Sequence, residues 1–164
     1  MITATIHGSE PLVHVSLAKE HRIVTYRLSE RDGTLTLVDS VTVNGGPGAL
    51  AYHPTLPLLF ASIRSTGNLA SFRVDTSTGK LTSINEIPAG ADPAYLSVDK
   101  SGQLLMSAYY RAGKILVHAI KENGTLGEEL QSISTDERAH AIVPDRSGRY
   151  WFVPHTRPNA IFQF

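Results

Sequence analysis

The stretch GALAYHPTLPLLFASIRSTGNLASFRVDTSTGKLTSINEI, residues 48–87, decides the fold of this chain. It contains short segments of strand-like composition separated by turns that are rich in Pro, Gly, Ser, Thr and Asp. Residues 69–74 alternate between apolar and small or polar side chains, the period-two pattern of a half-buried strand. Residues 58–63 are mostly apolar and have the length of a strand. The stretch therefore predicts an antiparallel meander of strands over residues 48–53, 58–63, 69–74 and 81–87.

The same unit recurs with a period of 46 residues. The positions that keep this register are His53, Asp99 and Asp145, then Leu58, Leu104 and Tyr150, and then Leu69, Ile115 and Ile161. One period before His53 and Leu69 lie His7 and Ile23. Four short strands in each repeat of about 40 to 50 residues are typical of a β-propeller blade. The sequence therefore predicts an all-β chain that forms a single partial β-propeller domain over residues 1–164.

The period divides the chain into blade units 1–47, 48–93, 94–139 and 140–164, of which the last is incomplete. We expect about three and a half blades with strands A to D counted from the axis outward. In an up-and-down blade the A–B and C–D turns share one face, and the B–C turns and the links between blades share the other. Only the links and the B–C turns differ strongly from blade to blade. Variable connections on a fixed scaffold are where function usually lies, so we expect a site on this second face near the axis.

The composition excludes several classes of function. Fifteen basic and fifteen acidic side chains give no net charge, and no basic stripe is present, so we expect no nucleic-acid partner and no membrane partner. Cysteine is absent, which excludes disulfides, a thiolate nucleophile and Cys-ligated zinc. The remaining acidic and histidine residues lack compact metal-ligand spacing, so we expect no metal and no cofactor. Residues 1–7 lack the basic segment and the long apolar segment of a signal peptide, so we expect a cytoplasmic location.

Three segments carry a resemblance to a known family. They are Gly-Lys-Leu-Thr at residues 79–82, Gly-Pro-Gly-Ala-Leu-Ala-Tyr-His-Pro at 46–54, and Ala-His-Ala-Ile-Val-Pro-Asp-Arg-Ser-Gly-Arg-Tyr-Trp-Phe-Val-Pro at 139–154. With these segments the chain resembles the N-terminal half of the seven-bladed propeller lactonases, which include bacterial 6-phosphogluconolactonases and fungal muconate-lactonising enzymes. The resemblance implies a carboxylic ester hydrolase of carbohydrate metabolism that acts on a small lactone or sugar phosphate. The family also uses an arginine and a glutamate in motifs around Pro-Arg-His and Asn-Glu-Leu, which this sequence lacks.

His140 is the candidate catalytic residue. The resemblance places the histidine of the family site on it, and the repeat singles it out independently, because Gly48 and Ala94 occupy the same position in earlier blades. A neutral imidazole there could act as general base toward water or as a donor to a lactone carbonyl.

The candidate substrate-binding residues lie in the variable connections. They are Glu137 and Arg138 in a link, Arg64, Arg111 and Arg157 in B–C turns, and His155 at the end of a strand B. Guanidinium groups suit the recognition of phosphate and carboxylate. We expect His14, His53 and His118, which take packing or turn positions of the repeat, to be structural.

The sequence leaves two classes of function open. The first is a lactone hydrolase that opens a sugar lactone, phosphorylated or not, by water attack with an electrostatically stabilised oxyanion. The alternative is a propeller that binds a ligand or protein without catalysis, or an inactive fragment of a lactonase, because propellers host many functions. Two chains of three and a half blades would sum to about seven, so either a homodimer or a missing C-terminal half could close the ring.

Overall fold

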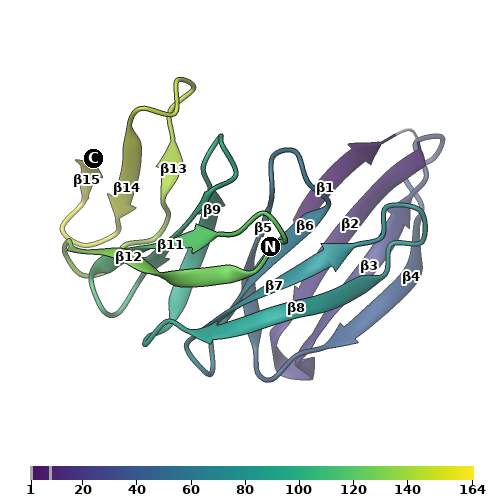
Figure 1. Cartoon of the computed structure of the whole chain (residues 1–164), viewed down its shortest axis with the longest axis horizontal. Coiled ribbons are helices and arrows are strands. Elements are labelled where there is room, and N and C mark those ends of the chain that lie inside the picture. Colours follow the sequence, from purple (N-terminus) through teal and green to yellow (C-terminus); the bar gives the residue numbers. More distant parts are fainter. Residues whose placement is uncertain (1, 8) are drawn as a thin grey trace.

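The computed structural model describes residues 2–7 and 9–164, with side-chain environments from residue 10 onward, and these residues form four antiparallel sheets in chain order (Figure 1). The first sheet, β1-β2-β3-β4, consists of Ile2–His7, Ser9–Leu17, Arg22–Leu28 and Leu35–Thr42. The second, β5-β6-β7-β8, consists of Pro47–Tyr52, Leu58–Ile63, Asn68–Val74 and Leu81–Pro88. The third, β9 to β12, consists of Pro93–Val98, Leu104–Tyr109, Lys114–Ile120 and Leu126–Ser134. The last, β13-β14-β15, consists of Val143–Pro144, Trp151–His155 and Ala160–Gln163.

The all-β class and the three and a half blades are confirmed. The strands expected over residues 48–87 are each present to within one residue, and the last sheet has three strands. His140 lies outside any strand, whereas Gly48 and Ala94, at the same repeat position, lie in β5 and β9. Strand A of the last blade is interrupted there: Ala139 forms an isolated bridge to His155, and β13 contains only two residues. The backbone N–H of His140 still donates to the Pro154 carbonyl at 2.9 Å.

The core lies between the sheets rather than inside any one of them. Each of three buried clusters joins two successive blades, the largest around Phe60 and Leu116, the next around Leu59 and Ile23, and the third around Val153 and Ile115. Strand β6 is buried on both faces along its whole length. Its residues are mostly apolar and do not alternate with polar ones, as expected for a strand that is covered on both sides.

Hydrogen bonds between blades repeat with the blades. Arg27 Nη2 donates to the Ser77 carbonyl at 2.8 Å, and Arg73 donates in the same way to the Asn123 carbonyl at 3.0 Å. The carboxylate of Asp39 accepts the Leu81 N–H at 2.8 Å. One blade later, Asn85 makes the corresponding bond with the Leu126 N–H at 3.0 Å. These bonds fix the register between neighbouring sheets.

The A–B turns explain why one repeat position holds His53, Asp99 and Asp145. His53 Nδ1 accepts backbone N–H groups of the turn, including that of Leu56 at 2.9 Å. Asp99 accepts backbone N–H groups of its own turn through its carboxylate, namely those of Ser101 at 3.0 Å and Leu104 at 2.8 Å. His53 Nε2 lies 3.1 Å from the carbonyl of Gly102, across the blade boundary. His53 therefore has the structural role expected from the sequence.

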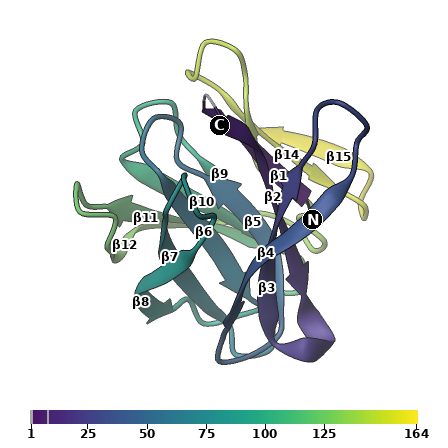
Figure 2. The same ribbon diagram turned by 90° about the vertical axis from the view of Figure 1, so that its right-hand side faces the viewer.

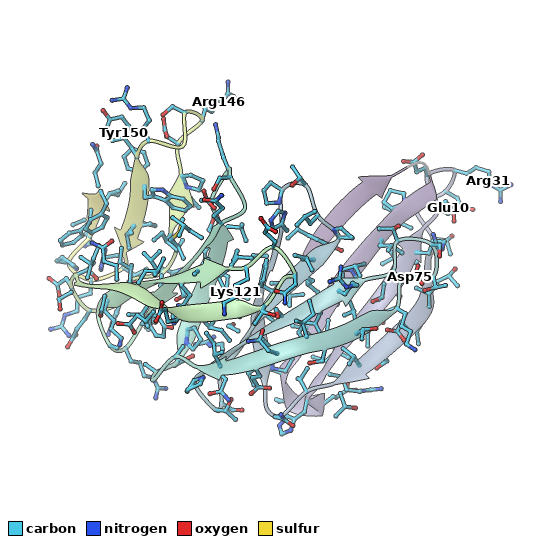
Figure 3. The ribbon with its side chains drawn as sticks, viewed as in Figure 1. Glu10, Arg31, Asp75, Lys121, Arg146 and Tyr150 are labelled. Atoms are coloured by element: carbon cyan, nitrogen blue, oxygen red, sulfur yellow. The ribbon has the colours of Figure 1, made fainter. Side chains whose placement is uncertain are left out.

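The two terminal sheets carry exposed apolar side chains. Figure 2 turns the first sheet toward the viewer; on its strand β4, Leu37 is 58% exposed. On the last sheet Ile161 is 69% exposed, and Tyr150 lies at its tip beside Arg146 (Figure 3). Within residues 2–7 and 9–164, no helix has the length and apolar character needed to cross a bilayer.

Candidate functional site

The face formed by the B–C turns and the links between blades carries a run of adjoining pockets. A pocket of about 530 Å³ draws its lining from the first three blades, namely Ala18, Lys19, His21, Gly46, Arg64, Ser65, Asp92 and Arg111. All of these residues belong to B–C turns or links. The face on which the sequence predicted a site is therefore hollowed and mostly basic.

Arg64 is held on this face by a two-point ion pair. Its Nε and Nη2 donate to the two carboxylate oxygens of Asp92 at 2.5 and 2.8 Å. This hydrogen bonding raises the pKa of Arg64 and lowers that of Asp92, whose pKa the charge of Arg111 lowers further. A Cβ added at Gly48 would collide with the aliphatic stem of Arg64. Gly48 is therefore a glycine because Arg64 occupies the space in front of it.

Arg111 and Arg138 meet at a second pocket on the same face. This pocket has a volume of about 290 Å³ and is lined by Tyr110, Arg111, Glu137 and Arg138. Neither guanidinium group forms an ion pair with another residue in the described part of the chain. The backbone of Arg138 is fixed by its N–H to the Tyr110 carbonyl at 2.6 Å, and it adopts a left-handed φ of 62°. Two unpaired guanidinium groups at one pocket have the chemistry to receive an anionic oxygen group.

His140 lies next to this second pocket. Its ring is edge-on to the ring of Tyr110, with centroids 5.8 Å apart and planes at 81°. Its side chain is exposed. The Tyr110 hydroxyl is 3.2 Å from Thr156 Oγ1, so that the tyrosine spans from the third blade to the fourth. Tyr110 thus contacts the His140 ring and also lines the pocket that contains Arg111 and Arg138.

Of the two remaining predicted residues, Arg157 lies at the edge of the site and His155 lies outside it. Arg157 lies 3.5 Å from Glu137 in an exposed ion pair at the rim. His155 is only 4% exposed, and its ring packs against Phe162 at 4.5 Å. Its Nδ1 is 2.9 Å from the Val153 carbonyl and its Nε2 3.0 Å from Thr135 Oγ1. Because both ring nitrogens are within hydrogen-bonding distance of other groups, His155 stabilises the packing of the last blade and lies apart from the pockets.

Two further residues, Tyr110 and Asp92, belong to this site and were not predicted from the sequence. Tyr110 follows Arg64 by one period, so the variation at that B–C position was a usable indication. Asp92 lies in a link between blades, and only the folded chain brings it to Arg64 and near Arg111. In the part of the chain that the structure describes, no group of three or more His, Asp or Glu residues could hold a metal ion.

Residues 12–163 match the family model described as lactonase, seven-bladed β-propeller. The chain belongs to this lactonase family. A comparison with curated proteins finds no match.

Solved structures show the same fold for this lactonase-family chain. A Lactobacillus plantarum protein superposes with a TM-score of 0.85 at 20% identity, over 99% of this chain and 50% of that one. A candidate 6-phosphogluconolactonase from Bacteroides fragilis superposes with a TM-score of 0.84 at 22% identity, over 98% and 49%. Its counterpart from Bacteroides uniformis gives 0.85 at 19% identity, over 93% and 46%. The chain thus spans about half the length of these structures, and at such identities the likeness concerns the fold alone.

Proposed function

We propose that the chain provides the lactone-binding and catalytic face of a sugar-lactone hydrolase of 6-phosphogluconolactonase type. The observation that carries the proposal is the position of His140 beside a pocket in which the guanidinium groups of Arg111 and Arg138 form no ion pair with any described residue. A phosphorylated or carboxylated sugar lactone offers anionic oxygens to these groups and a ring carbonyl to the histidine. Membership of the lactonase family supports the same class of reaction.

The proposed reaction needs one proton acceptor and one anion-stabilising group. The exposed imidazole of His140 accepts a proton from water as the water oxygen bonds to the lactone carbonyl carbon. The oxyanion that forms is stabilised by a nearby guanidinium. When the ring C–O bond breaks, the imidazolium returns the proton to the leaving alkoxide. The product is a hydroxy acid, which releases one proton to solvent at neutral pH.

We further propose a cytoplasmic protein in which other blades complete the ring, supplied by a second copy or by a C-terminal half. The exposed apolar side chains of Leu37 and Ile161, on the two terminal sheets, support the completion of the ring by further blades. Light scattering of the purified chain establishes which form is assayed.

The test is a titration of acid released from 6-phosphogluconolactone, corrected for spontaneous hydrolysis. We expect His140→Ala to lower kcat about 100-fold or more, the usual contribution of a general base. Arg138→Ala should raise KM for the phosphorylated lactone more than for gluconolactone. The matched control is Arg146→Ala, at the tip of the last sheet, which should change neither (Figure 3). Unchanged turnover in His140→Ala would remove the role of His140. Saturable binding without turnover would favour the alternative of a non-catalytic ligand-binding propeller.

A further inference from the structure

A third pocket lies between the second and third blades, separate from the two pockets lined by Arg64, Arg111 and Arg138. It has a volume of about 640 Å³. One wall is the end of β8 with the link that follows it, and the other is formed by β11 and β12. Its lining consists of Ile87, Pro88, Ala89, Gly90, Lys114, His118, Leu126, Gly127, Glu128 and Glu129. Arg64, Arg111, Arg138 and His140 are not among these residues, so a ligand here would not use the proposed lactone site.

His118 departs from the repeat inside this pocket. The corresponding positions of the other blades hold aromatic residues, namely Tyr26, Phe72 and Phe164. Phe72 is buried in the core between the first two blades, and His118 is buried to the same degree, at 2% exposure. Its Nδ1 is buried without a hydrogen-bond partner among the described residues. A buried polar atom without a partner reduces stability, whereas phenylalanine at this position would not. The packing of the chain itself therefore gives no reason for a histidine at this position.

Charged groups of both signs surround the His118 side chain. Lys114 lies on the same face of β11, four residues earlier, and its Nζ is 5.3 Å from the Tyr109 ring centroid. Glu129 is the partner of His118 in the β11–β12 ladder. Burial lowers the pKa of His118, while the charge of Glu129 raises it and that of Lys114 lowers it. Lys114, Glu128 and Glu129 form no ion pair with any described residue. The pocket therefore holds an unpaired ammonium group and two unpaired carboxylates beside apolar side chains.

We propose that this pocket between blades binds a small zwitterion, an α-amino acid with a short or apolar side chain. The ligand carboxylate pairs with Lys114, and its ammonium group pairs with Glu128 or Glu129. The imidazole of His118 supplies a neutral polar contact between them. Ile87, Ala89 and Leu126 provide the apolar surface for the ligand side chain.

Ligands of a single charge fit this lining less well. A simple anion would lie close to two carboxylates, and a simple organic cation would lie close to Lys114. A metal ion lacks a sufficient donor set, since the described residues hold no group of three or more His, Asp or Glu that could coordinate one. The paired charges of a zwitterion match both signs at once.

The test is isothermal titration calorimetry with glycine, L-alanine and L-leucine as probes. Two molecules of matched shape accompany L-leucine: 4-methylpentanoate, which lacks the ammonium group, and 3-methylbutylamine, which lacks the carboxylate. We expect at least one amino acid to bind, and each singly charged analogue of L-leucine to bind at least tenfold more weakly than L-leucine. No binding of any of the three amino acids, or equal binding of L-leucine and its analogues, would overturn the proposal.

Two variants locate the binding. His118→Phe restores the residue that the repeat holds at position 72, so it should fold, and it should lower the affinity at least tenfold. Lys114→Gln, at a partly exposed position, should lower the affinity for L-leucine. It should not lower the affinity for 3-methylbutylamine, because it removes a positive charge close to that cation. Arg138→Ala serves as the control because it alters only the proposed lactone site. Full affinity in both His118→Phe and Lys114→Gln would show that the amino acid binds elsewhere and would overturn the assignment.

Discussion

His14 should make the stability of this chain fall in mildly acidic solution. It lies on β2 and is fully buried, with Nδ1 2.8 Å from Thr25 Oγ1. Its ring faces that of Tyr52 at 5.5 Å, across the boundary between the first two blades. Burial lowers its pKa from the usual 6.5 to about 4, against a smaller opposite effect of the Asp39 charge. The folded protein therefore holds this histidine neutral at a pH at which the unfolded chain already protonates it.

The magnitude follows from the difference between the two states. As the pH falls below about 6.5, the unfolded state binds the proton first and gains stability relative to the folded state. The loss is complete only near pH 4, where the folded state also binds the proton. At about 1.4 kcal/mol for each tenfold change in the ionisation constant, the drop from 6.5 to about 4 corresponds to about 3 kcal/mol. This is a large part of the stability of an ordinary small domain.

The assay is urea unfolding followed by circular dichroism at several values between about pH 4.5 and 7.5, with His14→Met beside the unaltered chain. Met106 occupies the same repeat position two blades later, so methionine suits the site. The variant leaves Thr25 without its partner, which costs about 1 to 3 kcal/mol at every pH. Its stability should nevertheless change less with pH, and addition of His118→Phe should flatten the curve further. His21→Gln, at an exposed histidine, is the control and should leave the curve as it is. Equal pH dependence in His14→Met and the unaltered chain would refute the reasoning.

Two further perturbations test packing that the repeat makes comparable. Gly102 and Gly148 occupy the same turn one period apart, with φ near +78° and +75°. A Cβ added at Gly102 would collide with the His53 ring. A Cβ added at Gly148 would meet only the flexible Lys100 side chain, at 3.0 Å. Thermal unfolding should therefore show Gly102→Ala to be less stable than Gly148→Ala by about 1 to 3 kcal/mol, as for other overpacked sites; equal losses would contradict the close approach of the His53 ring to Gly102. Burial raises the pKa of Tyr109 to about 12, and Ser107 Oγ donates to its hydroxyl at 3.1 Å. Alkaline absorbance titration of the folded protein should show a late-titrating tyrosine that Tyr109→Phe removes, and its persistence in that variant would assign it to another residue.

The fold could be predicted because the same pattern of strands and turns recurs in every blade unit of the sequence. Each blade supplies an independent copy of the same strand and turn pattern, so an ambiguous segment in one blade is resolved by its counterparts. His53 illustrates this, since Asp99 and Asp145 at the same position indicate a turn acceptor before any coordinates are known. The break in the last strand A escaped prediction. Between the isolated bridge at Ala139 and the short strand at Val143–Pro144 the backbone leaves the sheet, and the repeat pattern carries no sign of this local departure.

The site could be predicted only in part, because its contacts run between blades. The repeat indicated the face and the variable positions, and these include Arg111 and Arg138, which share a pocket. It could not indicate that Asp92 would neutralise Arg64, since that contact depends on how a link folds back over a turn. Nor could it separate His155 from His140, because burial of the former depends on Thr135 and Phe162. A charged residue in a variable loop is thus only a weak indication of a binding site. Whether that residue forms an ion pair in the folded chain is a stronger one.

A size relation between two repeat positions gives a physical reason for the place of His140. Along the chain, one repeat position holds Gly48, Ala94 and His140, and a second, in the B–C turns, holds Arg64, Tyr110 and Thr156. The smallest of the first set, Gly48, goes with the long Arg64, and the largest, His140, goes with the small Thr156. In the second blade the two positions compete for space, because a Cβ at Gly48 would strike the Arg64 side chain. A small residue at position 156 thus goes with a large one at position 140. The imidazole is then free to turn toward Tyr110 of the neighbouring blade. Because positions 140 and 156 correspond to Gly48 and Arg64 of the second blade, we expect a larger residue at Thr156 to displace the His140 side chain.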